Sequence, residues 1–328
     1  MGYDTLTIGL DAGGTSTRAV LTTETGECVG YGVGGRGNPT SSGVEIAGDG
    51  VMASIAAALA ASSATMADVS VIATAMAGQR IGDEEGAWLM ARLSAEGFAG
   101  RLVFESDLAA TYFTGSAEPF GYAIVAGTGA CAVRIEDGRI AATADGLGWL
   151  LGDRGSGYWI GHRVARAVVR ELDHAGPRTA LTPALLAHLG ITAETARREG
   201  RLQVLDQVVE ALYALRPIEL AALAPLAFTA ADAVAERILH RAGAHLADTL
   251  AAVLDGPGPV VLGGSVLCRD SPVRDAFVRR LGAAADGLDM RPVVDGAVGA
   301  GLLALRAAGV AVSPETLARL SGSLAGMR

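Results

Sequence analysis

The sequence predicts an α/β protein made of two related domains. Three observations support this prediction: the length of the chain, a glycine-interrupted hairpin pattern that occurs twice, and a third strand that ends in paired glycines. With 328 residues, 50% of them apolar and 19% charged, the chain can bury a large core and divide into two domains. We expect the division near Ser116, which gives a first domain of residues 1–115 and a second of residues 116–328.

The first hairpin pattern lies near the start of the chain. The segments "LTIGLDA" and "RAVLT" have the apolar and β-branched residues of strands, and "GGTST" separates them. A turn, "TETGE", then leads to a third strand, "CVGYGV". Because glycine permits a tight bend and a close backbone approach, the first bend has room for a group the size of a phosphate.

The same order of elements returns in residues 121–146. There "GYAIVAGTGACAVRIEDGRIAATADG" gives a strand, Gly-Thr-Gly, a strand, a turn and a strand. A third element, "VVLGGSV", ends a buried type of strand with Gly263 and Gly264 and precedes the periodic helix "PVRDAFVRRLG". The repeat predicts two related domains that each present one glycine hairpin, although two unrelated hairpins would give the same pattern.

Helical periods account for much of the remaining chain. The stretch from Val51 to Ala67 predicts a buried, Ala-rich helix, and the segment from about Gly161 to Ala252 predicts several helices that suit an insertion in the second domain. The segment "DGAVGAGLLALRAAGV" is also predicted to be a helix. The last predicted helix, "SPETLARLSGSLAGMR", has Ser313 as its N-cap and Pro314 in its first turn.

Composition limits the classes of partner. The net charge of −9, with no run of basic residues to offset it, disfavours nucleic acid and favours small molecules. All 26 basic residues are Arg, and the absence of Lys excludes a Walker A loop and Schiff-base chemistry. The 3 cysteines are far apart, which argues against a disulfide framework and against a sequence-local metal site. No leader or membrane span is recognised, so we expect a cytoplasmic protein without a membrane partner.

Two glycine patterns also match a dinucleotide-binding fingerprint, "GVGGRG" at residues 32–37 and "GTGACA" at residues 127–132. Such a loop must open directly into the helix that holds the pyrophosphate. The first pattern is followed by Asn38 and Pro39, which disfavour a helix there, and the second by a strand and a turn. A Rossmann fold is therefore not assigned.

The three glycine breaks together resemble the phosphate 1, phosphate 2 and adenosine motifs of the sugar kinase, actin and Hsp70 superfamily. Further segments are similar to the N-acetylglucosamine kinase family, which also contains the ATPase activators of benzoyl-CoA reductase and hydroxyacyl-CoA dehydratases. These segments are "GNPT", "ESDLAAT", "AGTGA", "LAALAPLAF" and above all "DGLGWLLGDRGSGYWIG". The resemblance extends over nearly the whole chain.

This resemblance implies two ribonuclease H-like domains, as in actin-like ATPases, around an ATP cleft, with a helical insertion in the second domain. It also implies an ATP- and Mg²⁺-dependent kinase that converts N-acetylglucosamine to its 6-phosphate, in a homodimer. Glucosamine, N-acetylmannosamine, N-acetylmuramic acid and glucose remain alternative substrates. An activator ATPase and a non-catalytic sugar sensor are the alternative functions.

The resemblance also implies roles for individual residues. Asp11 would hold Mg²⁺ through water. The ATP-binding residues would be Gly13, Gly14, Thr15, Thr128, Gly129, Ala221, Gly263, Gly264 and Ser265. The sugar-binding residues would be Asn38, Asp107, Gly146, Leu147, Gly148, Trp149 and Asp153. Asp107 would also be the catalytic base, although a residue at that place could equally cap the following helix.

Two residues depart from the family pattern at the sugar site. Leu147 stands where the family has a sugar-contacting Trp, so Trp149 either replaces it against the sugar or belongs to the core. Arg154 stands where the family usually has Glu. If an acidic sugar is accepted, we expect Arg154 to bind its carboxylate through paired hydrogen bonds. The alternative is that Arg154 points to solvent or pairs with an acid such as Asp145.

Overall fold

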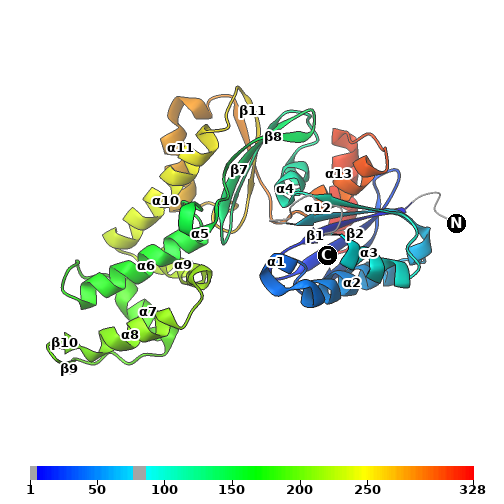
Figure 1. Cartoon of the computed structure of the whole chain (residues 1–328). Helices are drawn as coiled ribbons and strands as arrows, with labels where there is room; N and C mark the ends of the chain where they lie inside the picture. Colours follow the sequence, from blue (N-terminus) through cyan, green and yellow to red (C-terminus); the bar gives the residue numbers. More distant parts are fainter. Residues whose placement is uncertain (1–5, 77–85) are drawn as a thin grey trace.

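The computed structural model of the chain describes residues 6–76 and 86–328, and these form two lobes, each built on a mixed five-stranded sheet (Figure 1). In the first sheet the strand order is β3-β2-β1-β4-β5. Strands β1 to β3 are antiparallel neighbours, whereas β1, β4 and β5 run parallel. The strands are β1 (Leu6–Ala12), β2 (Thr17–Thr23), β3 (Cys28–Gly34), β4 (Val69–Met76) and β5 (Arg101–Glu105).

The second sheet repeats this arrangement. Its order is β12-β11-β6-β7-β8, with an antiparallel β6-β7-β8 meander and parallel β6, β11 and β12. The strands are β6 (Gly121–Ala126), β7 (Ala130–Glu136), β8 (Arg139–Asp145), β11 (Gly258–Gly263) and β12 (Leu288–Pro292). The predicted fold class, two related α/β domains, is therefore confirmed. The first two glycine breaks lie at the turn between the first two strands of a meander, and the third lies at the end of β11.

Helices of the first lobe cover the outer face of its sheet. They are α1 (Pro39–Ser42), α2 (Val44–Ala60) and α3 (Ala87–Ala95), and a short 3₁₀ turn, Met66–Asp68, precedes β4. Helix α2 packs closely on β3, where a β-carbon at Gly32 would come 2.1 Å from the carbonyl oxygen of Ser54. The helix predicted over residues 51–67 begins and ends earlier in the structure, at Val44 and Ala60. Only the face of α2 that is turned toward the sheet is buried.

The second lobe carries the predicted helical insertion between β8 and β11, which extends away from the first lobe (Figure 1). Helix α10 packs along α11, and the apolar residues of α6 and α10 form one core with strands β6, β7 and β11. The elements of the insertion are α5 (Gly148–Leu151), α6 (Gly157–Leu172), α7 (Leu181–Leu189), β9 (Arg197–Arg198), β10 (Arg201–Leu202), α8 (Gln203–Tyr213), a 3₁₀ segment (Pro217–Leu223), α9 (Ala224–Thr229) and α10 (Ala233–Ala251). Helix α11 (Pro272–Leu281) and a 3₁₀ turn (Gly282–Ala285) lie between β11 and β12.

Two helices lie between the two sheets and connect the lobes. Helix α4 (Asp107–Gly115) follows the first sheet in the chain but also packs on β6 and β11 of the second. Helix α12 (Ala297–Ala307) follows the second sheet but packs on β1, β2 and β4 of the first, and α13 (Pro314–Ala325) lies against β3. The prediction assigned α12 and α13 to the second domain, whereas the structure places them on the first sheet. The physical reason is that the inner face of that sheet needs apolar cover, which α12 supplies with the buried residues Ala297 to Leu305.

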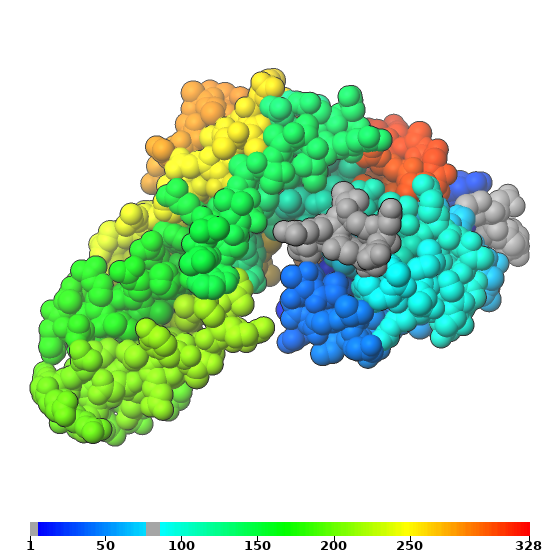
Figure 2. All heavy atoms as spheres, in the orientation of Figure 1, coloured from blue at the N-terminus to red at the C-terminus, as the bar shows by residue number. Residues whose placement is uncertain are grey.

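The two lobes join along one side and are separated by an open gap on the other, between the helical insertion and the segment that carries α1 (Figure 2). In the described ranges no single helix is long and apolar enough to cross a membrane. One bent pair of helical segments, Gln203–Tyr213 with Pro217–Thr229, passes that test of length and composition, with a bend of 118°.

Candidate active site

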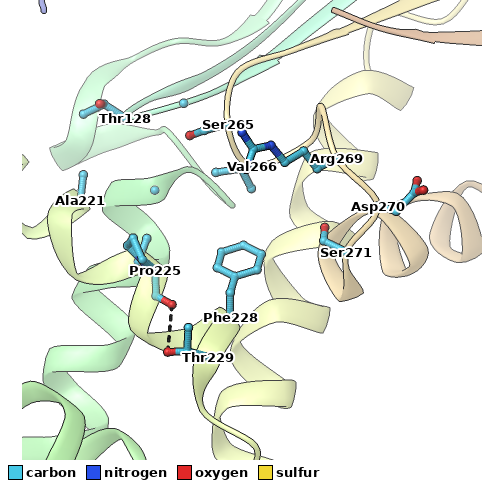
Figure 3. Close-up of a pocket in the computed structure, with 13 residues that line it drawn as sticks. Thr128, Ala221, Pro225, Phe228, Thr229, Ser265, Val266, Arg269, Asp270 and Ser271 are labelled. Atoms are coloured by element: carbon cyan, nitrogen blue, oxygen red, sulfur yellow. Dashed lines mark hydrogen bonds between the residues drawn. The ribbon is translucent and has the colours of Figure 1, made fainter. Parts of the chain in front are cut away.

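A cavity of about 420 Å³ in the second lobe brings together residues from three predicted motifs (Figure 3). Thr128 comes from the β6–β7 turn, Ala221 from the 3₁₀ segment before α9, and Ser265 from the turn after β11. Phe228 and Arg269 also line the cavity, and sequence reasoning did not identify either of them. An apolar wall with an aromatic ring and a few polar groups at one end suits a nucleotide.

The wall of this cavity depends on close backbone contacts between the two glycine turns. Gly264 has a φ of 82°, and a β-carbon there would come 2.4 Å from the carbonyl of Ala126. The amide of Val266 donates to that same carbonyl at 2.9 Å, and the amide of Gly157 donates to Gly127 O at 2.7 Å. At Gly127 itself a β-carbon would meet no atom within 4 Å, so its open side belongs to the cavity.

The first glycine turn, between β1 and β2, is similarly compact. The amide of Gly13 donates to Ser16 O, and the carbonyl of Gly13 accepts from the amide of Gly37, both at 3.0 Å. Gly14 and Thr15 are exposed at the tip of the turn, as Thr128 is in the second turn. The residues of the first turn do not line the cavity of the second lobe.

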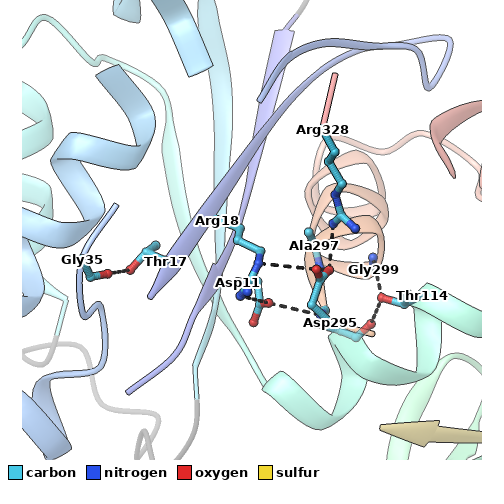
Figure 4. Close-up of polar contacts among 11 residues, drawn as sticks. Asp11, Thr17, Arg18, Gly35, Thr114, Asp295, Ala297, Gly299 and Arg328 are labelled. Carbon is cyan, nitrogen blue, oxygen red and sulfur yellow. Dashed lines mark hydrogen bonds and ion pairs between the residues drawn. The ribbon is translucent and has the colours of Figure 1, made fainter. Parts of the chain in front are cut away.

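Asp11, at the end of β1, lies in a network of charges between the lobes (Figure 4). Its Oδ2 accepts from the amide of Gly296 at 3.1 Å and lies 3.6 Å from Nη1 of Arg18. Arg18 also reaches Asp295, with Nε 3.4 Å from Oδ2, and Arg328 pairs with the other oxygen of Asp295 at 2.9 Å. Sequence reasoning did not identify Arg18 or Asp295, because Asp295 is brought to β1 by α12.

Burial raises the pKa of Asp11 to about 6, against the opposing charge of Arg18, and the nearby Asp295 and Asp107 raise it further. The described residues contain no group of three or more His, Cys, Asp or Glu that could hold a metal. A single carboxylate nevertheless fits Mg²⁺, which keeps several waters and uses few protein ligands. Asp11 is therefore a suitable residue for the Mg²⁺ that accompanies a nucleotide.

Asp107 is the first residue of α4, and the structure separates its two possible roles. The N-cap is Ser106, whose hydroxyl accepts from the amide of Leu108 at 3.2 Å, so the cap is already supplied. Burial raises the pKa of Asp107, partly opposed by backbone hydrogen bonds. Its surroundings include a cavity of about 590 Å³, which Glu105 of β5, Arg139 of the β7–β8 hairpin and Arg306 of α12 also line. A carboxylate with a raised pKa beside a cavity is suited to take a proton.

Cys131, a residue that sequence reasoning did not connect with the site, indicates how the predicted sugar residues gather. Burial raises the pKa of its thiol to about 12, and the carboxylates of Asp107, Asp145 and Asp153 raise it in the same direction. A β-carbon at Gly146 would come 2.9 Å from its Sγ. Gly146 therefore lies against the thiol on β7, and Asp107, Asp145 and Asp153 are near enough for their charges to act on it.

Asp153 is buried and holds the base of the second hairpin. Its Oδ1 accepts from the amide of Ala130 at 3.0 Å, and its own amide donates to Oδ1 of Asp145 at 2.6 Å. Burial raises its pKa, opposed by the hydrogen bond from Ala130. Asp145 and Asp153 have φ of 62° and 54°. Strained left-handed residues persist where the surrounding structure holds them, and such strain gathers at functional sites.

The short helix α5 and its N-cap residue, Leu147, expose their apolar side chains instead of burying them. The exposed fraction is 66% for Leu147 and 41% for Trp149, whose ring meets Tyr158 edge-on with 6.0 Å between the centroids. Trp149 is therefore not a core residue. Gly148 has a φ of 80° and starts the helix.

The side chain of Arg154 contacts His245 of α10, with 2.8 Å from Nη2 to Nδ1, and the backbone amide of Arg154 donates to Asp145.

Asn38 lies in the first lobe, where it is buried and caps α1 by accepting from the amide of Thr40 at 2.9 Å.

Comparisons with known proteins show the family of the chain. Residues 8–304 match the model of the BadF/BadG/BcrA/BcrD ATPase family. The chain is 30% identical over 197 residues to N-acetyl-D-glucosamine kinase of Dictyostelium discoideum, covering 57% of this chain and 59% of the relative. It is 27% identical to N-acetylmuramic acid/N-acetylglucosamine kinase of Clostridium acetobutylicum, covering 48% and 50%. The chain thus spans between half and three fifths of the curated relatives it matches.

Solved structures extend the likeness to almost the whole chain. A candidate N-acetylglucosamine kinase from Chromobacterium violaceum superposes with a TM-score of 0.70 at 25% identity, covering 91% of this chain and 98% of that one. A glucokinase of the ROK family from Streptomyces griseus shares the fold, with a TM-score of 0.53 at 20% identity, covering 92% and 99%. Because the family model covers most of the two lobes, the chain belongs to the BadF/BadG/BcrA/BcrD ATPase family.

Proposed function

We propose that this protein is an ATP-dependent kinase that transfers the γ-phosphoryl group to an amino sugar, with N-acetylglucosamine as the expected substrate. The observation that carries the proposal is the placement of Asp107, a carboxylate with a raised pKa that is not the N-cap of α4 and lies beside a cavity. The similarity to kinases of N-acetylglucosamine, N-acetylmuramic acid and glucosamine supports this substrate class.

The nucleotide would occupy the cavity of the second lobe. Its adenosine part would lie against Ala221 and Phe228, beside Ser265, and the turn that holds Thr128 would contact the phosphates. The first turn, with Gly13, Gly14 and Thr15, would approach the phosphates from the other lobe. Glycine turns allow backbone amides to cradle phosphates without a lysine, which this chain lacks.

Asp11 would hold Mg²⁺ through water, and the hydrogen bond from Gly296 keeps its carboxylate oriented. Mg²⁺, when bound, would neutralise the charge of the phosphates during transfer. The pair between Arg18 and Asp11 has a 3.6 Å separation, so it leaves room for Asp11 to accept further hydrogen bonds from water.

Asp107 would act as the base. Its carboxylate would take the proton of the sugar 6-hydroxyl while the hydroxyl oxygen bonds to the γ-phosphorus and the bond from that phosphorus to the bridging oxygen breaks, which releases ADP. Gly146, Leu147, Gly148, Trp149, Asp153 and Asn38 would position the sugar. Phosphoryl transfer needs mainly an oriented nucleophile and neutralised charge. These residues would orient the nucleophile, and Mg²⁺ at Asp11 would supply the neutralising charge.

Coupled ADP release with and without a panel of sugars tests this function. We expect turnover to require a sugar and to be fastest with N-acetylglucosamine or a close relative, and the product to be a sugar 6-phosphate by NMR. Sugar-independent hydrolysis would favour an activator-type ATPase, as the family name allows, and binding without turnover would favour a sensor. Glucosamine, N-acetylmannosamine, N-acetylmuramic acid and glucose belong in the panel as the alternative acceptors.

We also propose that the protein acts in the cytoplasm as a homodimer, as the resemblance to N-acetylglucosamine kinases implies. Light scattering coupled to size exclusion, over a range of concentrations, measures the mass directly. A mass near that of one chain at all concentrations would exclude the dimer.

A further inference from the structure

A cluster of basic residues lies on the helical insertion, although the chain as a whole has a net charge of −9. It consists of His162, Arg163 and Arg166 of α6, Arg241 and His245 of α10, and Arg154 in the loop between α5 and α6. We call these six residues the basic cluster. The sequence shows no basic run because the cluster draws on three separate segments, and only the packing of α6 against α10 brings them together.

Direct contacts join four residues of this region. Nη2 of Arg154 lies 2.8 Å from Nδ1 of His245, whose ring meets Trp159 edge-on with 5.1 Å between the centroids. The guanidinium of Arg163 lies over the same Trp159 ring, 5.0 Å from its centroid. Trp159 therefore contacts both Arg163 and His245, and His245 contacts Arg154, so packing against the ring positions these basic groups.

Acidic partners are absent from the cluster among the residues that the structure describes. No carboxylate pairs with the guanidinium group of Arg154, Arg163, Arg166 or Arg241, although the backbone amide of Arg154 donates to Asp145 at 3.0 Å. Nε of Arg163 is buried without a hydrogen-bond partner. Asp248 of α10, the acid that acts on His245, is engaged by Arg280 at 2.9 Å.

Among the described residues, eight arginines outside the cluster have acidic partners. Arg92, for example, pairs with Glu45 and Asp49 at 2.9 and 2.7 Å.

The charges of the cluster also act on one another. Burial, followed by the charges of Arg166 and Arg241, lowers the pKa of Arg163. Burial and then the charge of Arg154 lower the pKa of His245, with Arg241 and Arg163 acting in the same direction. This mutual repulsion destabilises the bare surface, and an anion that bridges the guanidinium groups would relieve it.

We propose that the basic cluster is a second anion site, which takes a small molecule bearing a phosphate group. Planar guanidinium groups bind phosphate oxygens through paired hydrogen bonds, and several of them on adjacent helices suit a divalent or higher anion. The site is separate from the nucleotide cavity, because the residues of the cluster do not line that cavity. A nucleic acid is a poorer fit, since the cluster is compact and the rest of the chain is acidic.

Calorimetric titration of inorganic pyrophosphate, in magnesium-free buffer at constant ionic strength, tests the proposal on five proteins. The wild type should bind, and Arg163→Gln/Arg241→Gln should bind at least tenfold more weakly, which corresponds to about 1.4 kcal/mol. The matched control is Arg101→Gln/Arg178→Gln, which removes the same charge at exposed arginines outside the cluster and should bind as the wild type does. Gly127→Val, which fills the nucleotide cavity, should also retain binding.

Three results would overturn the proposal. Equal affinity in the wild type and the cluster variant, or loss of binding only in Gly127→Val, would place the anion elsewhere. Tighter binding of oligonucleotides, growing with their length, would identify a nucleic-acid surface instead. Arg163 packs on Trp159, so its replacement can also lower the stability of the fold. The single variant Arg241→Gln, which changes an exposed residue, is therefore included. It should bind pyrophosphate at least threefold more weakly than the wild type, with an unchanged melting temperature.

Discussion

Gly299 of α12 lies directly against the carbonyl of Ala110 of α4: a β-carbon at Gly299 would come 1.7 Å from that oxygen. The hydroxyl of Thr114 completes the contact by donating to Ala110 O and accepting from the amide of Gly299, both at 2.9 Å (Figure 4). The two helices that connect the lobes thus meet backbone to backbone. This contact explains why a helix from the end of the chain can lie on the first sheet.

Replacing Gly299 by Ala should therefore destabilise the protein. The added carbon cannot be accommodated without separating α4 from α12, and such overpacking typically costs about 1–3 kcal/mol. Urea unfolding measures the effect as a lower midpoint. The control is Gly322→Ala in α13, where a β-carbon meets nothing within 4 Å and Ala should stabilise by up to about 1 kcal/mol. Equal midpoints for the two variants would contradict the close packing.

Gly127→Val should raise the KM for ATP at least about tenfold without changing the fold. A β-carbon at Gly127 meets no protein atom within 4 Å, and the residue has no positive φ that would strain a side chain. The side chain would therefore project into the nucleotide cavity, which Gly127 lines. Steady-state kinetics over a range of ATP concentrations, with circular dichroism as the check on folding, measure both. Gly14→Val should act likewise from the first turn, and unchanged ATP kinetics in both folded variants would remove these turns from the site.

Asp107→Asn should lower kcat by about two to four orders of magnitude, the usual contribution of a positioned base, while ATP affinity stays near that of the wild type. Ser106→Ala is the matched control: it removes the N-cap of α4, which typically costs about 1 kcal/mol of stability, but leaves the base in place. Its kcat should therefore change little. A nearly normal kcat in Asp107→Asn would refute the mechanism.

Stability should depend on the ionisation of Asp11. Its folded pKa of about 6 lies above the usual value of 3.8, so between these pH values the native state binds more protons than the unfolded state. The contribution of Asp11 to stability consequently falls as pH rises from about 4 to about 6, and then stays constant. Asp11→Asn cannot ionise but can still accept from Gly296. The free energy of unfolding of Asp11→Asn, relative to that of the wild type, should therefore rise by about 1–3 kcal/mol between pH 4 and pH 6 in metal-free buffer.

Urea titrations of both proteins at several pH values between 4 and 8 measure this difference. A difference between Asp11→Asn and the wild type that does not change with pH would show that Asp11 is already ionised at pH 4. The corresponding expectation for activity is a loss below about pH 6, because a protonated Asp11 accepts fewer hydrogen bonds from metal-bound water.

The sequence by itself determined the features that depend on neighbouring residues. The strand–glycine–strand pattern predicted both meanders, and Ser313 at the N-cap of α13 was read correctly, because turn and cap geometry depend on a few adjacent residues. The repeated pattern also predicted two related sheets, which share the same strand order. Thr128, Ala221 and Ser265 were identified through family resemblance, and the structure places them around one cavity.

Tertiary structure decided the features that join distant segments. The exchange of α4 and α12 between the sheets, the approach of Asp295 to Arg18, and the place of Cys131 among three carboxylates depend on contacts between residues far apart in the chain. Periodicity shows that a helix has an apolar face but does not show which sheet will cover it. The basic cluster is of the same kind, because its charges are dispersed in the sequence and become a cluster only when α6 packs on α10.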